Sequence, residues 1–95
     1  MTPRTEPAAV DVAARPIARR YRTIVRKPRR ALMTGWRKDM IAAIDAVIDD
    51  FRGLDEIEVE NCNDGLRLVV ESVAGYDAAE IARGIKARAL TRCAS

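Results

Sequence analysis

The residues of this chain best suited to chemistry are basic ones, crowded near its start. Between positions 15 and 38 the sequence holds ten Arg or Lys residues and no acidic residue. The planar guanidinium group of arginine binds phosphate through paired hydrogen bonds and also stacks on bases. Tyr21 and Trp36 lie within the same stretch, and aromatic rings of this kind are suited to stacking on nucleic-acid bases. The pattern therefore predicts contact with nucleic-acid phosphates, through Arg19, Arg20, Arg22, Arg26, Lys27, Arg29 and Arg30, with Arg37 and Lys38 flanking.

The charge of the chain is divided between two parts of the sequence. Residues 1–38 carry eleven Lys and Arg against two acids, whereas residues 39–95 carry six against twelve, for a net charge of +3. A segment this basic must find counter-charge, in a ligand, in a partner or in the acidic half of its own chain. Nucleic acid, either DNA or RNA, is the leading prediction. The alternative is a protein-protein interaction module, a small regulator or inhibitor that self-associates as a homodimer or binds an acidic protein.

Enzymatic chemistry has little support in the sequence. The chain has no histidine, which removes the commonest general base and the usual activator of Ser and Cys nucleophiles. Asp45 and Asp49 lie one helical turn apart, but Arg52 supplies counter-charge and the calcium-loop pattern is absent, so we expect a solvated helix face. Cys62 and Cys93 fit no metal-ligand spacing. We predict a non-enzymatic protein with no cofactor, no metal site and free thiols.

The element that carries most of the basic residues is ambiguous. Residues 16–27 place apolar side chains at helical spacing, which slightly favours a helix. The same residues also alternate as in a strand, with Tyr21, Thr23 and Val25 on the inner face. Pro28 ends either element, because it has no N–H group and restricts the residue before it. A basic loop is expected to follow.

The clearest element is an amphipathic helix over residues 35–52. Large apolar side chains recur on one face from Trp36 through Met40, so we expect the tryptophan in the core. Thr34 is the expected N-cap of this helix, and Gly53 is well placed to end it.

Two strands and a second helix follow. Residues 56–60 and 66–73 alternate between apolar and polar side chains, and Asp64-Gly65 between them is a strong hairpin signal. Arg67 is expected to meet a glutamate across this hairpin. Residues 77–91 predict the last helix, with Asp77 as its cap.

These elements together predict a small α+β fold. A lone hairpin is only marginally stable in water, so it needs a third strand or a second copy of itself. A strand at residues 20–26 supplies the third strand and gives a two-layer sandwich of order β-α-β-β-α, with both helices on one face. The alternative order is α-α-β-β-α. We place a single domain at residues 18–92, preceded by a flexible basic N-terminal arm of residues 1–17.

The sequence also carries expectations about location. No apolar run approaches the roughly 18 residues that span a bilayer, and the N-terminus lacks the apolar region of a secretory signal. We expect a cytoplasmic protein that does not bind membranes. The function predicted is that of a small binding protein whose basic N-terminal segment contacts nucleic-acid phosphates with low sequence specificity.

Overall fold

The computed structural model describes residues 17–94, which fold in the order β-α-β-β-α. The elements are β1 (Arg20–Arg26), α2 (Met33–Val47), the 3-10 turn η2 (Ile48–Asp50), β2 (Leu54–Cys62), β3 (Gly65–Ser72) and α3 (Ala78–Ala94). The predicted α+β fold and its element order along the chain are confirmed, and the alternative that began with a helix is wrong. Apart from Ile17, the predicted flexible arm lies outside the described residues.

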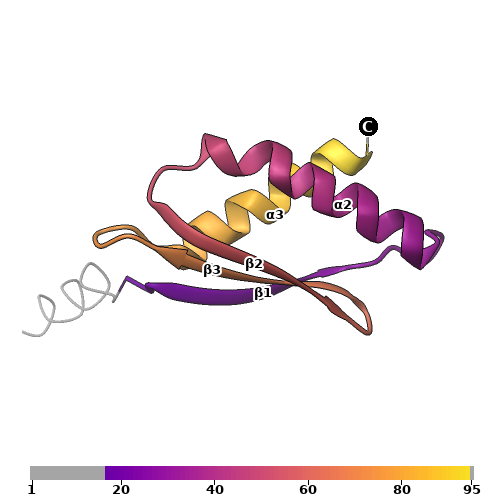
Figure 1. The fold of residues 1–95 in the computed structure, drawn as a ribbon, viewed down its shortest axis with the longest axis horizontal. Coiled ribbons are helices and arrows are strands. Elements are labelled where there is room, and N and C mark those ends of the chain that lie inside the picture. The colour runs from indigo at the N-terminus through magenta and orange to yellow at the C-terminus, as the bar shows by residue number, and fades with distance from the viewer. Residues whose placement is uncertain (1–16, 95) are drawn as a thin grey trace, which may run out of the picture.

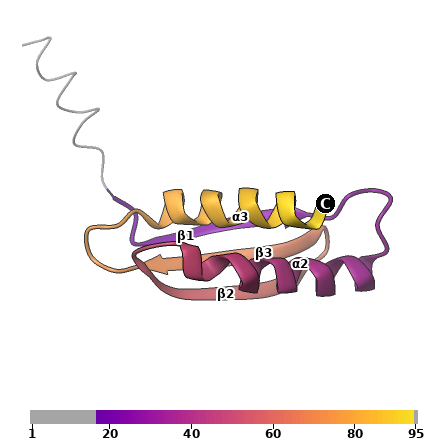
Figure 2. The same ribbon diagram turned by 90° about the horizontal axis from the view of Figure 1, so that it is seen from above.

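The three strands form one antiparallel sheet in the order β1-β3-β2 (Figure 1). Because β1 and β2 each run antiparallel to β3, they run in the same direction as one another. Both helices cover one face of the sheet, with α3 along the β1 side and α2 along the β2 side (Figure 2). Within residues 17–94 no helix lies over the opposite face, called the open face below, and β1 and β2 are the two edge strands.

The core lies between the helices and the sheet. Its largest fully buried side chains come from every layer: Met40, Ile44, Leu66, Leu68, Ile85, Val25 and Val70. Burying an aliphatic side chain of this size stabilises the fold by about 1.5–3 kcal/mol, so this aliphatic layer carries most of the stability. Trp36 is only 8% exposed and belongs to the same cluster, as predicted.

The alternation of β1 explains why this segment is a strand. Tyr21, Thr23 and Val25 pair with Val70, Leu68 and Leu66 of β3 and face the helices. The alternate residues Arg20, Arg22, Ile24 and Arg26 are exposed. A helix would bury only a short stripe of this segment. The strand instead completes a sheet that the hairpin could not stabilise alone, so tertiary pairing overrides the local helical pattern.

The first helix begins earlier than its sequence pattern indicates. It begins at Met33 with Leu32 in the N-cap position, and no side chain caps it. Thr34, the predicted cap, lies inside the first turn. The α-helix ends at Val47 and continues as the 3-10 turn, and Gly53, with φ of 80°, then reverses the chain.

The second helix has the predicted cap. The Asp77 carboxylate accepts a hydrogen bond from the N–H of Ala79 at 3.1 Å, which is the usual N-cap geometry. It also accepts one from the N–H of Ala18 at 3.3 Å, just before β1. The cap therefore holds both the start of α3 and the entry to the basic strand.

The β2–β3 turn is packed directly against the end of β1. Gly65 pairs with Arg26, and a Cβ atom at Gly65 would overlap the carbonyl oxygen of Val25. The N–H of Lys27 donates to the carbonyl oxygen of Asp64 at 2.7 Å. Glycine is therefore required at this position for close backbone approach as well as for the turn.

Candidate nucleic-acid interface

The basic strand β1 presents its arginines on the open face. Arg20 lies 3.7 Å from the Glu71 carboxylate and Arg26 lies 3.9 Å from that of Asp64, both as exposed ion pairs. Such pairs are worth between 0 and about 1 kcal/mol, so they neutralise these arginines only loosely. Arg22, also exposed, has no acidic partner among residues 17–94.

The acidic strand β2 lies at the other edge of the same face. A row across the sheet runs from Arg22 through Val69 to Glu58, so an apolar side chain separates the two charges. Two strand spacings amount to about 10 Å, and that is about the Debye length at 0.1 M salt. The glutamates of β2 are therefore largely screened from β1. Arg67 of β3 is the cation that does meet this edge, at 3.0 Å from Glu60, as predicted for the hairpin.

The loop after β1 contains two kinds of basic residue. The Lys27 ammonium group donates hydrogen bonds to the carbonyl oxygens of Pro28 at 3.0 Å and Ala31 at 2.8 Å, so it closes the loop on itself. Arg29 and Arg30 are exposed and have no acidic or carbonyl partner in the described part of the chain. The loop that contains them joins β1 to the start of α2 (Figure 1).

Two neighbouring basic residues of α2 have different environments. Arg37 donates from Nη2 to the carbonyl oxygens of Cys62 at 2.5 Å and Gly65 at 3.4 Å, which ties the helix to the β2–β3 turn. Its Nε atom is buried without a partner. Lys38 is exposed and makes no such bond within residues 17–94. Arg37 therefore supports the fold, whereas Lys38 adds charge to the surface.

The nine predicted contact residues thus fall into groups according to the partners that each already has within the protein. Arg19 donates to the carbonyl oxygen of Ser72 at 2.8 Å, and it joins Lys27 and Arg37 as donors to backbone. Arg20 and Arg26 are in loose ion pairs. The pair of Arg26 is the longer and more exposed of the two, so we count Arg26 with the available cations. We call these cations the basic surface; they come from β1, the loop after it and α2, and are Arg22, Arg26, Arg29, Arg30 and Lys38.

The N-terminus of α2 adds positive potential beside this surface. The first turn contains no acidic residue and no capping side chain, and Thr34 and Gly35 are exposed. Unsatisfied N–H groups and the helix dipole make such an end favourable for an anion. Sequence reasoning missed this feature because it placed the cap at Thr34, and an uncapped helix start has no distinctive sequence signal.

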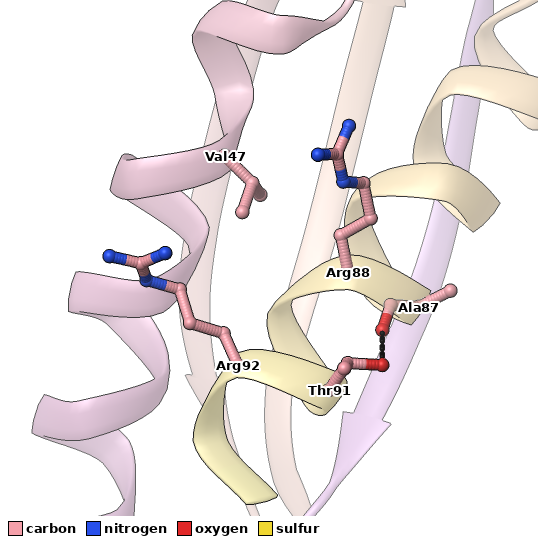
Figure 3. Close-up of a pocket in the computed structure, with 5 residues that line it drawn as sticks. All are labelled: Val47, Ala87, Arg88, Thr91 and Arg92. Atoms are coloured by element: carbon pink, nitrogen blue, oxygen red, sulfur yellow. Dashed lines mark hydrogen bonds between the residues drawn. The ribbon is translucent and has the colours of Figure 1, made fainter. Parts of the chain in front are cut away.

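The hollows of the molecule lie on the helical side. One hollow of about 410 Å³ between α2 and α3 is lined by Val47, Ala87, Arg88, Thr91 and Arg92 (Figure 3). Thr91 donates there to the carbonyl oxygen of Ala87 at 3.0 Å, and Arg88 is held by Asp50 at 3.2 Å. These side chains supply charge and packing rather than an acid–base pair. A second, mostly apolar hollow of about 460 Å³ reaches Trp36 and Cys93.

Both cysteines are free thiols. Burial raises the pKa of the Cys93 thiol, and the nearby Asp39 carboxylate raises it further. A thiol with a raised pKa holds less thiolate at neutral pH, so Cys93 is a poor nucleophile.

Within residues 17–94 no group of three His, Cys, Asp or Glu side chains is arranged to hold a metal ion. None of the helices in that range is long and apolar enough to cross a membrane.

Comparison with protein-family models, with curated proteins and with solved structures finds no match to this chain.

Proposed function

We propose that this protein is a small non-enzymatic binding protein whose basic surface contacts nucleic-acid phosphates with low sequence specificity. The observation that supports this function best is the placement of β1. The central strand β3 separates the basic edge from the acidic one, so the glutamates of β2 do not pair with the arginines of β1. Together with the arginines of the following loop, β1 therefore presents a positive surface that still requires counter-charge.

Binding through this surface would be directed at the phosphate backbone. The Trp36 ring is buried, and the Tyr21 ring lies against the Arg83 guanidinium group, 5.5 Å from ring centroid to carbon. Neither ring is free to stack on a base. Phosphate contacts fix position without reading sequence, which is why we expect low specificity.

The proposal predicts how strongly added salt should weaken the binding of nucleic acid. Five cations on duplex DNA would give a slope of log K against log salt of about −4.5, from counterion release. Between 50 and 200 mM salt, that slope corresponds to a loss of affinity of about 500-fold. A surface that only contacted protein hydrogen-bonding groups would show a much flatter dependence.

Fluorescence anisotropy with labelled oligonucleotides of about 20 nucleotides tests the proposal. Single- and double-stranded DNA and RNA are titrated with the full chain from about 50 to 300 mM salt. The double variant Arg29→Glu/Arg30→Glu should weaken binding by about 100-fold at 100 mM salt. The matched control is Arg52→Glu/Arg92→Glu, because it also reverses two charges, both residues are exposed, and neither belongs to the basic surface. Absence of binding at 50 mM salt, or equal loss in the control, would contradict the proposal.

An acidic protein is the second candidate partner. The observation that favours it is the outer edge of β1, where backbone N–H and C=O groups have no strand to pair with among residues 17–94. Nucleic acid cannot form the ladder of backbone hydrogen bonds that an added strand forms with those groups. An acidic extended segment would satisfy the backbone edge and the arginines at the same time.

A further inference from the structure

The sheet has two free edges that carry opposite charge. In the part of the chain that the structure describes, β1 and β2 are each hydrogen-bonded to β3 on one side only. They are seven and nine residues long, and neither contains the proline that commonly blocks an edge strand. On the open face β1 carries arginines and β2 carries Glu56, Glu58 and Glu60. Long edges of this kind are templates for adding another strand.

Symmetric pairing of two copies would bring like charges together. A twofold axis perpendicular to the sheet would pair β1 with β1 of a second copy, antiparallel, and keep both helical layers on one side. Arginines would then lie opposite arginines on the shared open face. The same operation on β2 would place glutamates opposite glutamates. Like charges directly opposite one another on a sheet are destabilising, so the charge pattern disfavours both symmetric dimers.

Pairing of unlike edges is matched in both charge and direction. Because β1 and β2 run the same way, a second copy shifted sideways along the sheet places its β2 beside β1 as a parallel strand. Its helices then remain on the same side, and its open face continues the first. In the register of the rows within one sheet, Arg20 meets Glu56 of the next copy and Arg22 meets Glu58 of the next copy. Antiparallel pairing of the same two edges would put these charges on opposite faces.

We propose that copies of this chain assemble head to tail, with β1 of one copy pairing with β2 of the next to continue the sheet. The occupant of each free edge is therefore a second copy of the chain, selected by charge. The contact is heterologous, so every added copy exposes a new β1 or β2 edge, and growth stops only if a ring closes. The strand-to-strand twist gives such an assembly a helical path. This inference does not require nucleic-acid binding, but Arg22 takes part in both, so an edge filled by a second copy would leave Arg22 paired with Glu58 rather than open to phosphate.

A charge-swap experiment tests the assembly. Nuclease-treated full chain is examined by sedimentation velocity over a concentration series at about 50 and about 500 mM salt. Wild-type protein should form species that grow with concentration and dissociate at high salt. Arg22→Glu alone and Glu58→Arg alone should each raise the concentration needed for assembly by at least about tenfold, because each places like charges across the contact. Circular dichroism checks that both variants are folded.

Mixing the two variants is the decisive step. In the mixture, each junction joins either Glu at position 22 to Arg at position 58, or the original arginine to the original glutamate. Both junctions are matched, so assembly should return to within a few-fold of wild type. The control pair is Asp45→Arg and Arg52→Glu. Both residues are exposed and lie outside the two edge strands, so reversing their charges should leave assembly unchanged. A wild-type chain that stays monomeric at low salt, a closed symmetric dimer, or a mixture of folded variants that fails to assemble would overturn the proposal.

Discussion

The two edge strands of this sheet share a direction and a face but carry opposite charge. Along β1 the outward residues are mostly arginines, and along β2 they are glutamates. The central strand separates them and mixes both signs, with Glu71 and Arg67 on either side of Val69. A sheet of order β1-β2-β3 would have set the arginines beside the glutamates, at about 4.8 Å. Strand order, rather than composition, therefore decides whether the charges cancel.

The comparison also separates two uses of a basic residue. On the basic side, Lys27 donates to backbone carbonyls of the loop after β1, and Arg37 donates to carbonyls of the β2–β3 turn. The basic residues Arg26, Arg29, Arg30 and Lys38 near them are exposed. A run of basic residues in a sequence is thus an upper limit on the number of cations that a ligand can meet.

The largest effect is expected where the basic edge is attached to the sheet. Gly65→Ala places a Cβ atom against the backbone of Val25, which cannot move without breaking the pairing of β1 with β3. We expect a loss of roughly 3 kcal/mol in the free energy of unfolding, measured by urea denaturation. Gly35→Ala is the control, since nothing lies within 4 Å of a Cβ there. It should leave stability unchanged or raise it by up to about 1 kcal/mol. Equal effects of the two substitutions would contradict the close approach.

Much of this fold could be predicted from local patterns. The hairpin at Asp64-Gly65 and the cap at Asp77 were visible in the sequence, because each depends on residues a few positions apart. The local pattern of residues 16–27 slightly favoured a helix, and the strand β1 followed instead from the need of the hairpin for a third strand. The close contact of Gly65 with Val25 and the bonds from Arg37 to the β2–β3 turn were not visible. They join residues 25 or more positions apart, and no spacing rule encodes which arginine reaches which carbonyl.

A smaller effect should separate Arg37 from its neighbour. Arg37→Ala removes a charged donor from two carbonyl oxygens, so we expect about 2 kcal/mol of destabilisation. Lys38→Ala should change stability by less than about 0.5 kcal/mol but should weaken oligonucleotide binding. Urea denaturation and fluorescence anisotropy, measured on both variants, test whether Arg37 supports the fold and Lys38 contributes to binding. A destabilised Lys38 variant, or an Arg37 variant of unchanged stability, would show that the two roles are assigned the wrong way round.

Glu60→Gln should release one more cation, Arg67, on the open face. It breaks the exposed pair with Arg67, which costs about 0.5 kcal/mol or less of stability. The released arginine lies on the open face beside the basic edge, so affinity for duplex DNA at 100 mM salt should rise by about threefold. Asp45→Asn removes one exposed negative charge from α2 instead and serves as the control. An unchanged affinity in Glu60→Gln would mean that the phosphates do not reach the middle of the sheet.

The most direct test of the central claim compares two arginines of the open face that differ in their partners. Arg22 has no acidic partner among the described residues, whereas Arg67 is held by Glu60. The slope of log K against log salt for duplex DNA is measured for Arg22→Ala and Arg67→Ala. Loss of Arg22 should reduce the magnitude of the slope by about 0.9, the value for one phosphate contact, and loss of Arg67 should leave it unchanged. Equal slopes in the two variants would contradict the claim that the basic edge, left unneutralised by strand order, is the surface that binds.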